Sequence, residues 1–539
     1  MRRSTRYSLT RCGGVTTPGD SLPVVSTRSD GTAPSFSSGR EATRRLSSRA
    51  GPCSLAILRP SGINELGARR FTGPVRWGSD RGWQLPRPRY SLVLLVSGRH
   101  YLLRARAAPA RDPQVGTNVS KVPKQLWVVN HYAAVPSKDG RSGRHLAFAN
   151  HLRDHGWSTT LLVSSTTYPA GLQALHGRRL KQDTFEGEVR VRWLRANAYH
   201  GNTPLRFLGM LIFALVALLP RSTKDLPKPD AVIGSTVHPL AAWAGWRLAR
   251  RYNVPFVYEV RDIWPDVLIE LGRLRGKGPL AVAIRRLSKR LAIQASLVIS
   301  PLAGVGKHLD AIGAGATPFL WVSNGIDSPE RIEGEQRNRG GQLGTFTFMY
   351  IGSFNQSNRL ADMISAFETL VAREPGRNWR LRLIGDGPLR GSLEACVASS
   401  ASSALISVEP PIPKDEVIRT AREAECLVAM LHDYEVYRYG ISLNKLYDYL
   451  LAARPVVFAS NAPNDPISEA KAGLVVPPDD LDAFTRAMAT IGNMTRKARN
   501  RMGENGRRHV VRSYSYEALT RKLVEGLDAL VGDDRGRRE

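Results

Sequence analysis

Several features are scarce in this 539-residue sequence, and each scarcity excludes a class of protein. Its four cysteines form no CxxC pair and no cluster with histidines. A structural zinc site or a disulfide framework is therefore not expected, which suits a reducing compartment. The longest apolar run, residues 207–219, counts 13 residues between Arg206 and Arg221, too few for the roughly 20 that span a bilayer. This run predicts either a buried helix or a helix lying in a membrane surface.

Lysine is absent from the first 120 residues, which carry 20 arginines and six acidic residues, nearly half of the net charge of +30. This region is rich in Ser, Gly, Pro and Thr and has short apolar patches at 92–96 and 101–103. Its composition predicts that residues 1–120 form a disordered extension. Three explanations stay open: an organellar transit peptide, a basic arm for nucleic acid or anionic lipid, or sequence outside the natural protein. We favour the third, with a natural start near Val119, because an arginine-only basic composition is typical of translated GC-rich sequence.

From residue 125 onward, short apolar strands alternate with amphipathic helices, a pattern that predicts parallel sheets. The pattern divides the chain into a first α/β domain (121–326), a charged, Gly-rich linker (327–344) and a second α/β domain (345–504). Helices that pack back toward the first domain (505–530) and a tail (531–539) follow. The predicted strands are 126–130, 160–164, 189–194, 231–234, 256–260, 297–299, 319–322, 345–351, 380–384, 406–408, 426–430, 456–459 and 474–476. The fold class is thus α/β, with two doubly wound, Rossmann-like domains facing a cleft where ligands bind.

The segment 439–457, YGISLNKLYDYLLAARPVV, is the most informative stretch. Gly440, Ile441 and Ser442 are predicted to place free backbone N–H groups at a helix start, where anions bind. Lys445 adds a positive charge, and Asp448 adds a carboxylate on the same side of the helix. A phosphate site followed by a carboxylate is what a nucleotide-sugar enzyme needs, although an ordinary amphipathic helix remains the alternative.

Three further motifs lie at predicted strand ends. Gly140 and Gly143 open a helix after the first strand, where backbone could approach a ligand, or they form a plain turn. Arg261 and Asp262 follow the buried strand 256–260, which indicates a functional site. The alternative is a structural ion pair, either Arg261 with Asp262 or Glu259 with an arginine. A tight turn containing Gly385 follows another strand and says little alone.

Seven segments in this order resemble group 1 (family 4) glycosyltransferases of the GT-B fold, over residues 126–515. They are NHYAAVPSKDGRSGRHLAFANHLRDHGW, YEVRDIWPDVLIELG, SNGID, YIGSF, IGDGPL, YGISLNKLYDYLLAARPVV and AGLVVPPDD. The fucosamine-transferase-like branch of bacterial O-antigen and capsule synthesis is the nearest likeness. The resemblance implies a retaining, hexosyltransferase-like enzyme. It would move a sugar from a nucleotide diphosphate donor, a UDP-sugar, to a lipid-linked or other saccharide acceptor.

The resemblance also assigns roles by motif position. Lys445 matches a diphosphate-binding lysine, and Asp448 matches the second acidic position of a paired-glutamate motif that reaches the ribose. Gly440 stands where many relatives carry the first glutamate, and Glu435 could replace it only if the loop bends back. The other donor-side positions are Gly140, Gly143, Gly352, Ser353, Gly385, Asp386, Ile412, Ile441 and Ser442.

The catalytic residues expected are Lys445, Asp262 and Arg261. Lys445 and the helix start, with Arg359 as a further candidate, would stabilise charge on the leaving phosphate. Asp262 would orient or deprotonate the acceptor hydroxyl, and Arg261 replaces the histidine of many relatives. No DxD-like carboxylate cluster stands at a strand end, so no metal and no cofactor is expected.

The expected partners are the nucleotide sugar, the acceptor and an anionic membrane surface, with no specific nucleic acid. The membrane surface would be contacted by the run 207–219 and by a stripe on the predicted helix 280–295, formed by Leu280, Ile284, Leu287 and Leu291. This indicates a cytoplasmic protein held peripherally at the inner face of the plasma membrane. Two alternatives remain: a nucleotide-sugar 2-epimerase of the same architecture, and a non-catalytic basic binding homologue.

Overall fold

The computed structural model describes residues 122–139, 142–167, 171–199, 204–236, 238–327 and 344–536, together with four short strands nearer the N-terminus. These strands pair antiparallel in the order β1-β4-β3-β2. They are β1 (Leu9–Arg11), β2 (Ser54–Leu58), β3 (Ser91–Val96) and β4 (Arg99–Leu103). β3 and β4 contain the two apolar patches noted above, whereas β1 and β2 were not anticipated. The remainder of residues 1–121 lies outside the described residues, so its predicted disorder stays a prediction.

An eight-stranded sheet forms the centre of the first domain, in the order β12-β11-β10-β9-β5-β6-β8-β7. Its strands are β5 (Lys124–Asn130), β6 (Trp157–Ser164), β7 (Lys181–Glu186), β8 (Val189–Leu194), β9 (Ala231–Thr236), β10 (Phe256–Val260), β11 (Leu297–Ser300) and β12 (Phe319–Trp321). Every pairing is parallel except that of β7 with β8. β7 (KQDTFE) was not predicted, because a polar edge strand lacks the apolar run that marks its buried neighbours.

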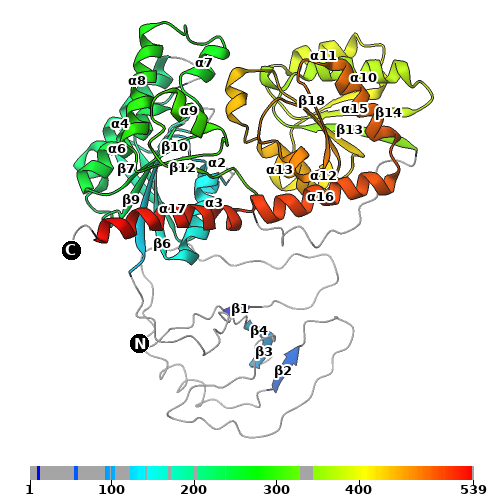
Figure 1. Cartoon of the computed structure of the whole chain (residues 1–539). Coiled ribbons are helices and arrows are strands. Elements are labelled where there is room, and N and C mark those ends of the chain that lie inside the picture. The colour runs from blue at the N-terminus through cyan, green and yellow to red at the C-terminus, as the bar shows by residue number, and fades with distance from the viewer. Residues whose placement is uncertain are drawn as a thin grey trace. The chain divides into compact units, whose positions relative to one another are not determined.

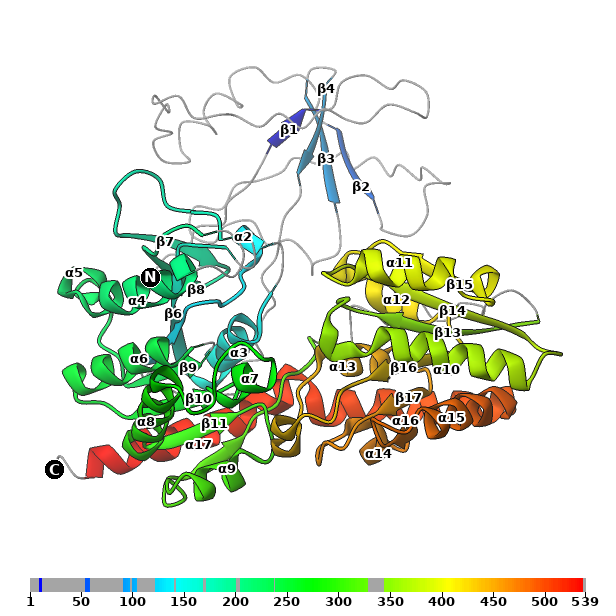
Figure 2. The ribbon, with the colours of Figure 1, turned by 90° about the horizontal axis from the view of Figure 1, so that it is seen from above.

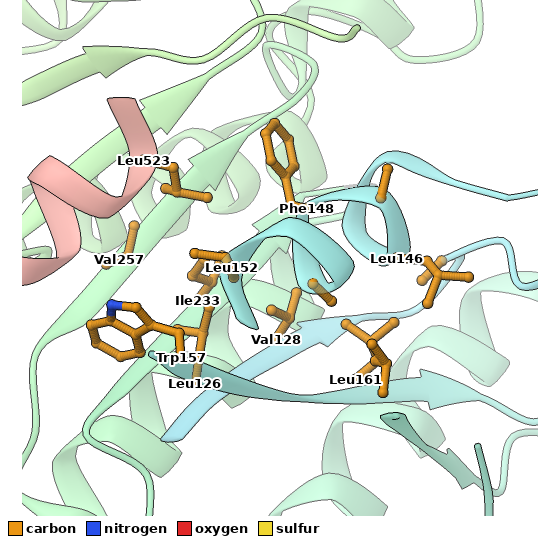
Figure 3. Close-up of a cluster of buried hydrophobic side chains, with 14 of the residues drawn as sticks. Leu126, Val128, Leu146, Phe148, Leu152, Trp157, Leu161, Ile233, Val257 and Leu523 are labelled. Carbon is orange, nitrogen blue, oxygen red and sulfur yellow. The ribbon is translucent and has the colours of Figure 1, made fainter. Parts of the chain in front are cut away.

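Two hydrophobic clusters cover the two faces of this sheet. One face packs against α3 (Arg144–Leu152) and α17 (Tyr516–Gly536). Figure 3 shows Leu523 of α17 in the same cluster as Phe148 of α3. The opposite face packs mainly against α4 (Pro204–Leu218), α6 (Pro239–Tyr252) and α8 (Pro279–Gln294). The smaller helices are α2 (Pro136–Asp139), α5 (Pro220–Thr223), α7 (Asp266–Glu270) and α9 (Val305–Ala311), with the 3-10 turn η1 (Arg153–His155).

Six parallel strands form the sheet of the second domain, in the order β15-β14-β13-β16-β17-β18. They are β13 (Thr345–Ile351), β14 (Asn378–Ile384), β15 (Ile406–Glu409), β16 (Cys426–Met430), β17 (Val456–Ala459) and β18 (Gly473–Val476). The helices are α10 (Leu360–Arg373), α11 (Arg390–Ala398), α12 (Val417–Ala421), α13 (Asn444–Leu451), α14 (Pro466–Ala470) and α15 (Leu481–Asn493). The 3-10 turns are η4 (Gln356–Asn358), η5 (Ser403–Leu405), η6 (Lys414–Glu416) and η7 (Glu435–Tyr439). Two doubly wound α/β domains are present, which confirms the predicted fold class.

The chain passes between the two domains at two adjacent points. Ile326, at the end of the first domain, forms a parallel bridge with Ser515. Ser515 joins α16 (Arg496–Tyr514) to α17. α16 packs against α13, while α17 packs against α3 of the first domain (Figure 1). Figure 2 shows α13 on the side of the second domain that faces the first. The loop before α13 therefore lies where the two domains meet.

Candidate active site

Two glycine turns of the second domain meet beside Lys445. Gly352 follows β13 and Gly385 follows β14. The backbone φ angle of Gly385 is +154°, and a Cβ atom on this residue would lie 1.8 Å from Gly352 O. A Cβ on Gly352 would lie 2.8 Å from Tyr350 Oη and 3.4 Å from Lys445 Cε. Only glycine permits the two turns to approach each other so closely. The structure thus brings together three residues predicted from the sequence, Gly352, Gly385 and Lys445, at the carboxyl edge of the sheet.

Lys445 is held by two uncharged acceptors. Its Nζ donates to Tyr350 Oη at 2.9 Å and to Asn358 Oδ1 at 2.6 Å. The ammonium also lies 4.5 Å from the centroid of the Tyr350 ring. Among the described residues no carboxylate pairs with it, and burial lowers the pKa of Lys445 to about 7. A partly buried cation without an acidic partner is a candidate anion site.

The loop before α13 differs from the prediction. The helix begins at Asn444, so Lys445 lies in its first turn. Gly440 N–H donates to Tyr437 O at 3.0 Å, and Ile441 N–H donates to Asn464 Oδ1 at 2.8 Å. The prediction of free N–H groups at Gly440 and Ile441 is therefore wrong, because both already donate hydrogen bonds to oxygen atoms of the same domain.

Arg359 also differs from the prediction. Its guanidinium is paired with Asp362 and Asp479 and donates to Pro478 O. Two carboxylates compensate its charge, so it cannot serve as an uncompensated cation for a leaving phosphate. Of the two side-chain cations expected to face the leaving phosphate, Lys445 is therefore the one that has no acidic partner among the described residues.

The remaining donor-side residues lie near the same edge. Asp448 pairs with the exposed Lys414, and burial raises the pKa of the Asp448 carboxyl despite that partner. Ile412 is half-buried against the hydrophobic cluster that contains Leu446. Ser353 and Asp386 are exposed at the ends of the two glycine turns. Gly140 lies outside the described residues.

A buried charge cluster underlies the first-domain side of the site. Glu259 in β10 contacts His145 Nε2 at 2.6 Å and Arg144 Nε at 3.1 Å. Although burial acts to raise it, these two neighbours hold the pKa of the Glu259 carboxyl well below its usual range. Gly143 caps α3, where a Cβ would lie 3.0 Å from Ala134 O. The expected alternative of a Glu259–Arg ion pair is therefore confirmed, with Arg144 as the arginine. This pair leaves open the role of Arg261 and Asp262.

Arg144 links this cluster to the second domain. Its guanidinium donates to Asn324 Oδ1 at 2.7 Å. Asn324 in turn donates from its backbone N–H to Ser442 Oγ at 3.1 Å and from its side chain to Ser442 O at 3.2 Å. Ser442 therefore serves here as a contact between the domains, and it immediately precedes the segment that leads to Lys445.

Arg261 and Asp262 extend from the carboxyl end of β10. Arg261 is half-buried and Asp262 is exposed, and neither side chain is engaged in the Glu259 cluster by a hydrogen bond. The surrounding protein nevertheless raises the pKa of Asp262 by desolvation. Burial, Tyr434, Glu270 and Asp262 together raise the pKa of Tyr437 in η7 to about 12. Asp262 thus lies within electrostatic range of Tyr437 in the second domain.

Tyr350, Asn358, Arg144 and His145 are the residues that sequence analysis missed. Tyr350 and Asn358 are 95 and 87 residues from Lys445, and no short motif joins them.

Among the residues that the structure describes, no group of three or more His, Cys, Asp or Glu side chains could hold a metal ion. No helix in the described part of the chain is long and apolar enough to cross a membrane.

Comparison with known proteins defines the class. Residues 143–325 match the family model described as glycosyl transferase 4-like domain, and residues 345–493 match the model described as glycosyl transferases group 1. Both α/β domains of the chain are therefore glycosyltransferase domains, arranged as in the GT-B fold. More particularly, the first is a 4-like domain and the second is a group 1 domain. No curated protein matches its sequence.

Solved structures with the same fold share little sequence with this chain. Sucrose-phosphate synthase from Thermosynechococcus elongatus is 14% identical, with a TM-score of 0.57 over 76% of this chain and 100% of its own. An E. coli structure described as trehalose-6-phosphate bound with UDP-2-fluoro glucose is 13% identical, with a TM-score of 0.56 over 75% and 99%. Anabaena HepE in complex with UDP-glucose is 14% identical, with a TM-score of 0.50 over 75% and 100%.

Proposed function

We propose that this glycosyltransferase takes its sugar from a UDP-sugar, with retention of configuration and without a metal ion. The observation that carries the proposal is the Lys445 ammonium, which lies beside two glycine turns and has no acidic partner among the described residues. Breaking the bond between the sugar and the diphosphate develops negative charge on the leaving phosphate, and a fixed cation there lowers the barrier. The similar folds solved with UDP or UDP-glucose support this choice of donor.

The first domain would supply the acceptor side. In this proposal the acceptor oxygen forms a bond to the sugar's anomeric carbon while the bond to the diphosphate breaks. Asp262 orients the acceptor hydroxyl or accepts its proton, and Arg261 adds positive charge nearby. The exposure of Asp262 at the end of β10 supports an acceptor-facing role. Arg144, Asn324 and Ser442 would hold the two domains in register.

We further propose a lipid-linked saccharide acceptor at the cytoplasmic face of the plasma membrane, in cell-surface polysaccharide synthesis of the fucosamine-transferase-like type. The support is an apolar face of α4 and the residue that follows it. Its exposed side chains are Leu205, Phe207, Leu208, Leu211, Leu215 and Leu219. The stripe predicted on α8 does not form an exposed apolar surface, because Leu291 is buried and Leu287 packs against the core. Exposed Arg221 and Lys224 follow α4 and would favour anionic lipid.

A panel of nucleotide sugars tests the proposed reaction. The full chain is incubated with each sugar nucleotide, with and without an extract that contains lipid-linked saccharides, and nucleotide diphosphate release is measured. Release of UDP that depends on the acceptor is expected. Release from a different nucleotide class would refute the donor assignment. An epimerised nucleotide sugar formed without acceptor would instead indicate the epimerase alternative.

A further inference from the structure

We infer that Asn358 and Tyr350 are positioning residues, which aim the Lys445 ammonium at the diphosphate of the nucleotide. The inference rests on the proposed function and adds to it the residues that orient the cation. An ammonium on a flexible four-carbon side chain has no preferred direction of its own, so something must restrict it if it is to act as a preorganised charge.

Asn358 can present only its oxygen to Lys445. The ammonium donates hydrogen bonds and accepts none, which fixes the orientation of the amide. The other end of the amide is also engaged, since Asn358 Nδ2 donates to Ser353 O at 2.9 Å and to Asn355 Oδ1 at 2.7 Å. Asn358 is 4% exposed. Its oxygen is therefore a fixed acceptor rather than a mobile one.

Tyr350 is fixed in the same sense. Its hydroxyl donates to Ser353 O at 2.9 Å, so its oxygen lone pairs face Lys445 Nζ, which donates to it at 2.9 Å. Desolvation raises the pKa of Tyr350, which keeps the phenol protonated. The ring also lies beside the ammonium, which adds a cation–π contact. Two fixed acceptors thus hold two of the three ammonium N–H groups.

The third N–H group remains for the ligand. Both acceptors are neutral, so the positive charge of Lys445 is solvated without being compensated. Gly352 beside it leaves room where any side chain would collide with Tyr350 Oη at 2.8 Å. A carboxylate in the place of Asn358 would hold the lysine equally well but would cancel the charge that a diphosphate requires.

The inference is tested with the full chain by calorimetric binding of UDP and of uridine, which lacks the phosphates. Asn358→Ala and Tyr350→Phe should each weaken UDP binding by roughly tenfold or more, as expected for a lost hydrogen bond to a charged group, and leave uridine binding unchanged. Gln356→Ala, whose exposed side chain lies in the same turn, is the control and should change neither. Should Asn358→Ala fail to fold, Tyr350→Phe alone decides, because it removes one oxygen and keeps the ring.

A double-mutant cycle with Lys445→Met separates this inference from the proposed function. If Asn358 acts through the lysine, Asn358→Ala has no further effect on UDP binding in a Lys445→Met protein. An equal loss in both backgrounds, or an equal loss for uridine, would overturn the inference. If Lys445→Met itself leaves UDP binding unchanged, the proposed role of the lysine fails instead.

Discussion

At the scale of single residues, the site depends on a cation whose charge state changes near neutral pH. The pKa of Lys445 is lowered to about 7 by burial alone. Asp448, one turn further along α13, is already paired with Lys414 and does not compensate it. A bound diphosphate would restore the charged form, because an anion nearby raises the pKa of a lysine.

UDP binding should therefore be coupled to proton uptake. The free protein loses the Lys445 proton as the pH rises through about 7, while the complex keeps it. The affinity for UDP should then fall by about tenfold per pH unit above that value, until the pKa of the complex is reached. Calorimetry between pH 7.5 and 9 in buffers of different ionisation enthalpy measures the uptake. Lys445→Met should abolish the slope, and an unchanged slope in that variant would assign the proton to another group.

Asp448 should act on a different part of the nucleotide from Lys445. Its proposed partner is a ribose hydroxyl, so Asp448→Asn should weaken UDP and uridine binding alike, by about tenfold to a hundredfold for a lost charge-assisted hydrogen bond. Asp415→Asn removes an exposed carboxylate of η6 and is the matched control. A loss confined to UDP would place Asp448 at the phosphates and contradict the ribose assignment.

At the scale of elements, the buried strands were predictable from the sequence and the start of α13 was not. Strands such as β10 and β16 have the predicted bounds, because continuous apolar runs buried on both faces leave few alternatives. The segment before Lys445 predicts an open anion site, but the Asn464 side chain, 23 residues beyond Ile441, accepts a hydrogen bond from the Ile441 N–H. The hydrogen-bond partners of Lys445 are Tyr350 in β13 and Asn358 in η4. Contacts of this range depend on the tertiary fold and leave no local pattern.

The exposed face of α4 gives the element-scale prediction. Leu211 and Leu215 are 41% and 49% exposed on α4, most of whose residues are apolar. In a chain lacking residues 1–118, which removes the basic extension, we expect sedimentation with anionic but not neutral vesicles and loss of binding in the double variant Leu211→Glu, Leu215→Glu. Leu172→Glu, at a leucine that is 57% exposed outside α4, is the control. A chain that stays in the supernatant at low salt would show that this face does not bind lipid.

At the scale of the whole molecule, every element of the two glycosyltransferase domains lies beyond the first 121 residues. β5 begins at Lys124, whose Nζ contacts Asp528 of α17 at 2.7 Å. The strand β5 and the helix α17 of the two-domain part of the chain therefore contact each other without the arginine-rich region. Closure of the two domains about the crossing points at Ile326 and Ser515 would exclude water from the donor.

Removal of residues 1–118 should leave the melting temperature and the transferase activity unchanged. The physical reason is that the composition of residues 1–118 predicts a segment too poor in apolar residues to offset about 1–2 kcal/mol of backbone entropy per residue. Such a segment should add little to the stability of the two domains. Thermal unfolding and activity of the two chains, compared in one buffer, provide the measurement. A lower melting temperature for the shorter chain would mean that the extension stabilises the transferase domains.

The role of Lys445 at the leaving diphosphate is tested most directly by the rate of sugar transfer by Lys445→Ala under saturating donor. A preorganised cation at the leaving diphosphate predicts a fall of roughly 10²-fold or more in turnover, with the unfolding temperature unchanged. Lys497→Ala, at an exposed lysine of α16, should keep full activity. A folded Lys445→Ala protein that transfers sugar at nearly the normal rate would show that Lys445 does not stabilise the leaving diphosphate.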